Sequence, residues 1–90
     1  MTGTRTDITA SIREAVAAYG QLAVDVQTLA DTDDLFHAGL TSLANVTVLL
    51  GLESAFGIEF PERMLRRSTF ESISAIRSAV EELVGENEPT

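Results

Sequence analysis

The sequence predicts an all-α fold, a small helical bundle of three main helices plus one short helix. Apolar residues recur at three- and four-residue spacing in three separate segments, which is the period of an amphipathic helix. Glycines follow the first two segments and a serine precedes the third, as expected at helix ends. Ninety residues suffice for one modest core. We therefore expect one domain over residues 7–84, with flexible ends at residues 1–6 and 85–90.

The first helix is expected over residues 7–19. Thr6 or Asp7 is expected to cap its start through a side-chain oxygen, and Gly20 to end it in the left-handed conformation. Arg13 falls on the face opposite the apolar one. The apolar residues of the expected buried face are Ile8, Ile12, Ala15, Val16 and Tyr19.

Residues 21–41 sustain no helical period, and we expect an ordered loop there. Loops beyond about 12–15 residues are normally functional or disordered, but apolar residues along this one can anchor it to a core. A short strand at residues 23–26 is an alternative with weak support, because no partner strand is apparent. The expected anchors are Leu22, Val24, Val26, Leu29, Leu35 and Phe36.

The second helix is expected from Ser42 to Phe56, with Gly57 ending it. Its apolar positions wrap too far for one narrow stripe, so the helix is either central or leaves an apolar face open to a partner. These positions are Leu43, Val46, Leu49, Leu50, Leu52 and Phe56.

The short helix is expected near residues 62–65, since Pro61 is tolerated in a first turn. Ser68-Thr69-Phe70-Glu71 matches a capping box, in which Ser68 and Glu71 each bond the other's backbone amide. A last helix should follow directly. Its expected buried stripe is Phe70, Ile73, Ile76, Val80 and Leu83.

The charge balance argues against several classes of partner. Fourteen acidic residues face six basic ones, all arginines, and this net charge of −8 disfavours nucleic acid and anionic membranes. No apolar run approaches the roughly 18 residues of a membrane span, and the start lacks the apolar region of a signal peptide. We therefore expect a soluble, cytoplasmic chain with protein partners.

The absence of cysteine excludes a disulfide framework, a thiolate metal site and a cysteine nucleophile, so any thiol chemistry must be imported. Calcium is also disfavoured. A calcium loop starting at Asp31 would place Phe36 where glycine is required and Ser42 where glutamate is required. We expect Asp31, Asp33 and Asp34 to be solvated, turn-forming residues and expect no metal site.

An autonomous enzyme is not expected. His37 is the only histidine, and a lone histidine beside an aromatic residue is more often packed or exposed than catalytic. Ser42 does not sit in a nucleophile elbow, because Ala44 stands where that motif requires glycine. No catalytic residue is therefore assigned.

Ser42 admits two interpretations. It follows Gly39, which can bend the chain, and begins the most apolar helix, where free backbone amides and the helix dipole favour an attached phosphate. The simpler interpretation is an N-cap, which Thr41 or Ser42 could provide equally well. The residues alone leave both open.

Residues 34–43, Asp-Leu-Phe-His-Ala-Gly-Leu-Thr-Ser-Leu, resemble the attachment motif of acyl carrier and peptidyl carrier proteins. The order of elements is also similar over about residues 7–84. The resemblance implies a phosphopantetheine arm on Ser42, added from coenzyme A by a phosphopantetheinyl transferase. It also implies acyl or aminoacyl cargo held as a thioester, loading by an adenylating acyl or amino acid ligase, and delivery to downstream acyl-transfer enzymes.

The chain departs from this family in charge. Thr41 replaces the usual aspartate, and Ala44 and Thr47 stand at positions that are often acidic in fatty-acid carriers. Glu53 is the only charge between Ser42 and Gly57. This neutral helix predicts a specialised carrier, either a stand-alone one loaded with an amino acid or one for polyketide or peptide synthesis.

We expect the docking surface near the start of the second helix, the end at which the arm would be attached. Basic residues near the short helix are either a solvated face or a further partner contact. An acyl chain in the core and a small cargo at the surface both stay open, as does an unmodified helical interaction module. The candidate docking residues are Leu43, Val46, Thr47, Leu50, Arg63, Arg66 and Arg67.

Overall fold

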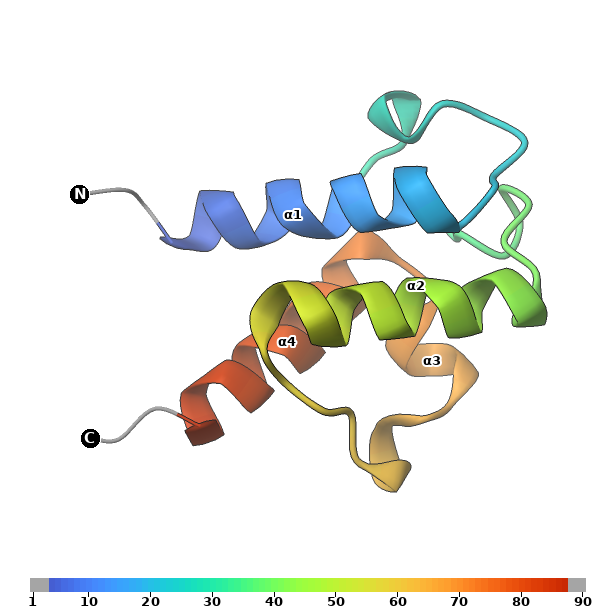
Figure 1. The fold of residues 1–90 in the computed structure, drawn as a ribbon. Coiled ribbons are helices and arrows are strands. Elements are labelled where there is room, and N and C mark those ends of the chain that lie inside the picture. The colour runs from blue at the N-terminus through green and yellow to red at the C-terminus, as the bar shows by residue number, and fades with distance from the viewer. Residues whose placement is uncertain (1–3, 88–90) are drawn as a thin grey trace.

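The computed structural model describes residues 4–87 and confirms the all-α bundle. Its long helices are α1 (Thr4–Tyr19), α2 (Ser42–Phe56) and α4 (Ile73–Asn87) (Figure 1). Its short elements are the 3₁₀ turns η1 (Val26–Thr28) and η2 (Glu62–Met64) and the one-turn helix α3 (Arg67–Phe70). None of residues 4–87 lies in a strand, so the alternative strand at 23–26 is wrong.

One apolar core joins all three long helices. α1 packs against α2 and α4, and α3 packs against α4 (Figure 1). The rings of Phe60 and Phe70 meet edge to face, with centroids 5.3 Å apart. The predicted buried stripe of the last helix is confirmed. The fully buried side chains are Ile12, Val16, Leu35, Val48, Leu52, Phe70, Ile73, Ile76 and Val80.

The long loop is ordered, as predicted, and Arg13 of α1 holds it. The Arg13 guanidinium donates to the carbonyls of Val26 and Leu29, each at 2.9 Å, and forms an ion pair with Asp31 at 2.6 Å. The prediction placed Arg13 opposite the core, yet its side chain is only 17% exposed. Three bonds to one guanidinium fix the loop against α1.

The loop also contacts the C-terminal half of the chain. The Leu35 amide donates to the Glu71 carbonyl at 2.7 Å, and the Ser74 amide donates to the Asp31 carbonyl at 2.8 Å. Leu35 is fully buried, but Val24, which was expected to be an anchor, is 46% exposed. Backbone bonds and a few apolar side chains together position the segment that leads into α2.

Both ends of α1 differ from the prediction. The helix begins at Thr4, so it includes part of the segment expected to be flexible and leaves the expected cap residues inside its first turn. At the other end the positive φ of 52° belongs to Gln21, not Gly20. Gly20 is needed for close packing instead, because a Cβ there would lie 2.6 Å from the Val16 carbonyl oxygen.

Tyr19 was expected in the core but is 44% exposed. Its ring lies over Gly51 of α2, where an added Cβ would stand 2.6 Å from a ring carbon. The absence of a side chain at Gly51 therefore lets the ring lie on the surface across the contact between α1 and α2.

The segment before α4 also differs from the prediction. The expected short helix at residues 62–65 is the 3₁₀ turn η2, and Ser68 lies inside α3. Ser72 caps α4 instead, since its Oγ accepts from the Ala75 amide at 3.0 Å. The cause is tertiary, because the Glu71 carbonyl accepts from Leu35 and is diverted from helical bonding.

α4 continues to Asn87, into the segment expected to be flexible from residue 85. Residues 1–3 and 88–90, also expected to be flexible, lie outside the described residues. Within residues 4–87, no helix combines the length and apolar character that crossing a membrane requires.

Candidate functional site

Ser42 is the first residue of α2, and the preceding turn places it there. Asp34 Oδ1 accepts from the amides of Phe36 and His37, at 2.9 and 3.3 Å, which closes the turn. Gly39 then adopts a φ of 117°, and an added Cβ would lie 2.8 Å from the Ala23 amide nitrogen. Only glycine suits this backbone and this close approach.

Thr41, not Ser42, caps α2. The Thr41 Oγ1 accepts from the Ala44 amide at 3.0 Å, and Thr41 has the extended backbone of an N-cap residue. This contact decides which of the two residues caps α2, and the attachment role of Ser42 stays a prediction. Ser42 is exposed and its hydroxyl is not used as the cap. It stands at the positive end of the helix dipole, where a phosphate is favoured.

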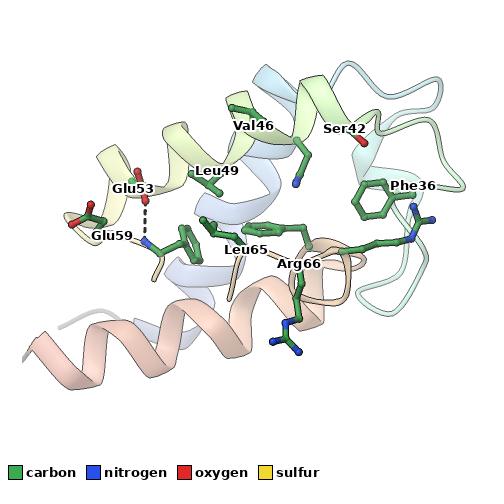
Figure 2. A pocket seen from close by; sticks show the side chains of 12 residues that line it. Phe36, Ser42, Val46, Leu49, Glu53, Glu59, Leu65 and Arg66 are labelled. Atoms are coloured by element: carbon green, nitrogen blue, oxygen red, sulfur yellow. Dashed lines mark hydrogen bonds between the residues drawn. The ribbon is translucent and has the colours of Figure 1, made fainter. Parts of the chain in front are cut away.

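A groove of about 700 Å³ runs beside Ser42, between α2 and the segment from Glu59 to Phe70 (Figure 2). Its volume falls in the range of small-molecule sites. Figure 2 shows Ser42 and Phe36 at one end of the groove and Glu53 and Glu59 at the other. Its apolar walls come from Val46, Leu49, Phe60, Leu65 and Phe70. The sequence did not predict this groove.

Asn45 also lines the groove, one helical turn after Ser42. Its Oδ1 is buried, and no described residue hydrogen-bonds to it. A buried amide oxygen without a donor is uncommon in a packed protein. Sequence reasoning missed Asn45, because asparagine in a helix carries no signal of its own.

The candidate docking residues on α2 all face solvent. Leu43 is 81% exposed, Val46 52% and Leu50 57%, and Thr47 is exposed as well. We call these four residues the α2 apolar face. Leu65, at 51% exposure, adds an apolar side chain near Ser42's groove that the sequence analysis missed. The docking role itself stays a prediction.

The three candidate arginines make different contacts. Arg63 pairs with Glu82 of α4 at 3.0 Å. The Arg67 guanidinium lies over the Phe36 ring, 4.1 Å from its centroid, which is a cation–π contact. Arg66 lines the groove, and in Figure 2 its guanidinium points away from α2. Arg66 and Arg67 line the groove, and Arg63 and Arg66 line a second hollow beside Glu82. A partner contact of these arginines stays a prediction.

The acidic loop residues have local roles. Asp33 Oδ2 accepts from the Ala30 amide at 2.9 Å and Asp34 closes its own turn, which confirms the predicted turn-forming role of both. Asp31 pairs with Arg13 instead. His37 is exposed. Within the part of the chain that the structure describes, no three His, Cys, Asp or Glu residues are placed to hold a metal ion.

Comparison with known proteins links this geometry to a chemistry. Residues 10–77 match the family described as "Phosphopantetheine attachment site". The chain is 52% identical over 71 residues to an aminoacyl carrier protein of Agrobacterium fabrum (strain C58 / ATCC 33970), covering 79% of this chain and 86% of that protein.

Two solved complexes contain similar chains. Both hold an engineered Bradyrhizobium japonicum glycine:[carrier protein] ligase with the carrier protein from Agrobacterium tumefaciens. In the complex with ATP, the similar chain has 49% identity and a TM-score of 0.82, over 84% of this chain and 99% of that one. In the complex with AMP the values are 51% and 0.79, over 81% and 97%.

Proposed function

Since this chain belongs to the phosphopantetheine attachment-site family, we propose that Ser42 bears the arm and that the cargo is an aminoacyl group. The chain is a carrier protein whose cofactor is phosphopantetheine. When attached, that group supplies a terminal thiol that holds cargo as a thioester, and so provides the sulfur that a chain without cysteine lacks.

The observation that carries the assignment to Ser42 is the cap on Thr41. Because Thr41 Oγ1 bonds the Ala44 amide, the exposed Ser42 hydroxyl is available as the acceptor of a phosphate ester. In the transfer from coenzyme A, Ser42 Oγ forms a bond to phosphorus and loses its proton. The pyrophosphate bond breaks, and adenosine 3′,5′-bisphosphate leaves.

The residues around Ser42 fit the arm. The N-terminus of α2 favours the phosphate, and Asn45, which lines the groove, offers a side-chain amide to the polar groups of the arm. The apolar walls of the groove can cover its methyl and methylene groups. These contacts would bind and orient the arm, while catalysis belongs to the enzymes that visit it.

An amino acid:[carrier protein] ligase is the proposed loading partner. The support is the similarity, at about half identity, to an aminoacyl carrier protein and to the carrier chains in the glycine ligase complexes. The neutral α2 apolar face would meet that ligase, and the phosphopantetheinyl transferase and downstream acyl-transfer enzymes would be further partners. A cytoplasmic location stays a prediction.

Intact mass tests the attachment. The purified chain and Ser42→Ala are incubated with coenzyme A and a promiscuous phosphopantetheinyl transferase. We expect the parent alone to gain the mass of one arm. Modification of Ser42→Ala would move the site elsewhere, whereas no gain under conditions that load a control carrier would refute the proposal.

A second candidate is an unmodified interaction module. The exposed leucines and valine of the α2 apolar face favour it, because apolar faces of this kind bind partner helices or grooves. In that case binding would survive in Ser42→Ala, since that serine is not even the cap of α2.

A further inference from the structure

We propose that the groove beside Ser42 is a subsite for the loaded arm and that Glu53 and Glu59 select cargo with a free ammonium group. This inference rests on the proposed function, because it needs an arm on Ser42. It goes further in naming where the cargo lies on the carrier and which chemical feature is recognised there.

The two ends of the groove carry opposite charge. At the Ser42 end, Arg67 is held over the Phe36 ring, and both side chains line the groove. Glu53 and Glu59 line the other end, with apolar wall in between (Figure 2). An arm loaded with an amino acid has the complementary polarity, since it is anionic at its phosphodiester, near Arg67, and cationic at its α-ammonium, near the two glutamates.

The spacing also matches. Glu53 follows Ser42 by eleven residues in α2, so at about 1.5 Å per residue the two lie roughly 16 Å apart along the helix axis. The arm spans about fourteen covalent bonds from the serine oxygen to sulfur, or roughly 16 Å at the rise of an extended chain. An arm lying along α2 therefore brings its cargo to Glu53.

Glu53 is held in place for this role. Its Oε2 accepts from the Phe60 amide at 2.8 Å, which fixes the carboxylate at the end of the groove and leaves Oε1 for a second donor. Glu53 is half-buried, so its charge is screened less than that of a fully solvated residue. Glu59 is exposed beside it and adds a second carboxylate.

The same end of the groove disfavours a simple acyl chain. An apolar cargo would lie against carboxylates and replace their water without giving them a hydrogen bond, which is unfavourable. A free α-ammonium offers three donors and a positive charge to the same atoms. The groove therefore discriminates by charge and not by size.

Matched cargoes test this inference. The chain is loaded by the transferase from amide-linked coenzyme A analogues, in which NH replaces sulfur so that the cargo is not hydrolysed. One analogue carries glycyl and the other propionyl, which has the same size but no ammonium. Backbone amide spectra of both forms are compared with those of the protein that carries the arm without cargo. The pH is about 6.5, at which an α-amino group is protonated.

We expect the glycyl form to shift the amides of Glu53, Glu59 and Phe60 beyond the propionyl form. Glu59→Gln, at an exposed position, should reduce the docked population about two- to fivefold, as for other partly solvated ion pairs. Glu53→Gln, which keeps an acceptor for the Phe60 amide, should act in the same direction. Glu14→Gln, which removes an equal charge from exposed α1, should change nothing.

The outcomes separate the two proposals. If mass spectrometry shows no arm on Ser42, the attachment proposal fails. If the arm is present but the glycyl and propionyl forms shift the same amides equally, the groove holds the arm without recognising the amine, and this inference is wrong. It is also wrong if neither cargo shifts the groove amides, since the loaded arm then lies in solvent.

Discussion

The helices α2 and α4 have the same length, 15 residues, but place their apolar side chains very differently. In α4 these side chains form one stripe that is buried, with Ile73, Ile76 and Val80 at 0% exposure. In α2, Val48 and Leu52 are buried as deeply, yet Leu43 stays 81% exposed. α4 thus contributes mainly to stability, whereas α2 keeps a second apolar face for contact with other molecules.

The two helices also differ in charge, since α4 has an ion pair on its outer side and α2 has only one charged residue. The outer side of α4 carries the ion pair between Arg77 and Glu81, at 3.1 Å. α2 has a single charged residue, Glu53, and its carboxylate is bonded to the Phe60 amide. Charges on a docking face would lose water when a partner binds, so a neutral face is easier to cover.

The largest expected effect is on stability, from Ile76→Ala in α4. Removing this fully buried side chain should lower the free energy of unfolding by about 2–5 kcal/mol, because the cavity loses packing as well as burial. Leu50→Ala, on the exposed side of α2, should change it by less than about 0.5 kcal/mol. Urea unfolding of both variants measures the two free energies of unfolding. Equal decreases would contradict the difference between α2 and α4.

The next effect is on loading, from Val46→Glu in the α2 apolar face. A charge that must be desolvated against a partner should slow loading by an amino acid:[carrier protein] ligase by about tenfold, roughly 1.4 kcal/mol. Ser78→Glu adds the same charge to an exposed position of α4 and serves as the control. Loading rates that are equal in Val46→Glu and the parent would remove the docking role of this face.

The smallest effect compares the two helix caps. Thr41→Ala and Ser72→Ala each remove a side-chain acceptor at 3.0 Å from a backbone amide, and each should destabilise the fold by about 1 kcal/mol. Only Thr41→Ala should also slow the addition of the arm, because Ser42 is its neighbour. Thr41→Ser should restore both properties, and similar arm-addition rates in the two alanine variants would contradict the distinction.

The fold was largely predictable because helical periodicity is a local signal. The stripe of α4 and the helix end at Gly57, with a φ of 63°, follow from residue types and spacing alone. Predictions failed where a distant contact intervened. Residues 68–71 match a capping box, but the Leu35 amide donates to the Glu71 carbonyl, and α4 begins at Ile73.

The candidate site shows the same division. Ser42 could be singled out from its motif and its place at a helix start. The cap on Thr41 is an equally local contact, with the Ala44 amide three residues on, although Thr41 and Ser42 were equally good cap candidates by residue type. The groove could not be predicted, because its walls come from α2 and from the segment 59–70, which only the fold brings together. Asn45 becomes a candidate site residue only because the fold places it in the lining of that groove.

The sequence by itself determined the helical class, the apolar stripes, the serine that begins α2 and the neutrality of that helix, because each depends on neighbouring residues in the chain. Tertiary structure alone decided that Arg13 holds the loop and that Glu53 lies at the end of a groove. These features depend on groups that are distant in sequence, whose contacts form only when the core is packed.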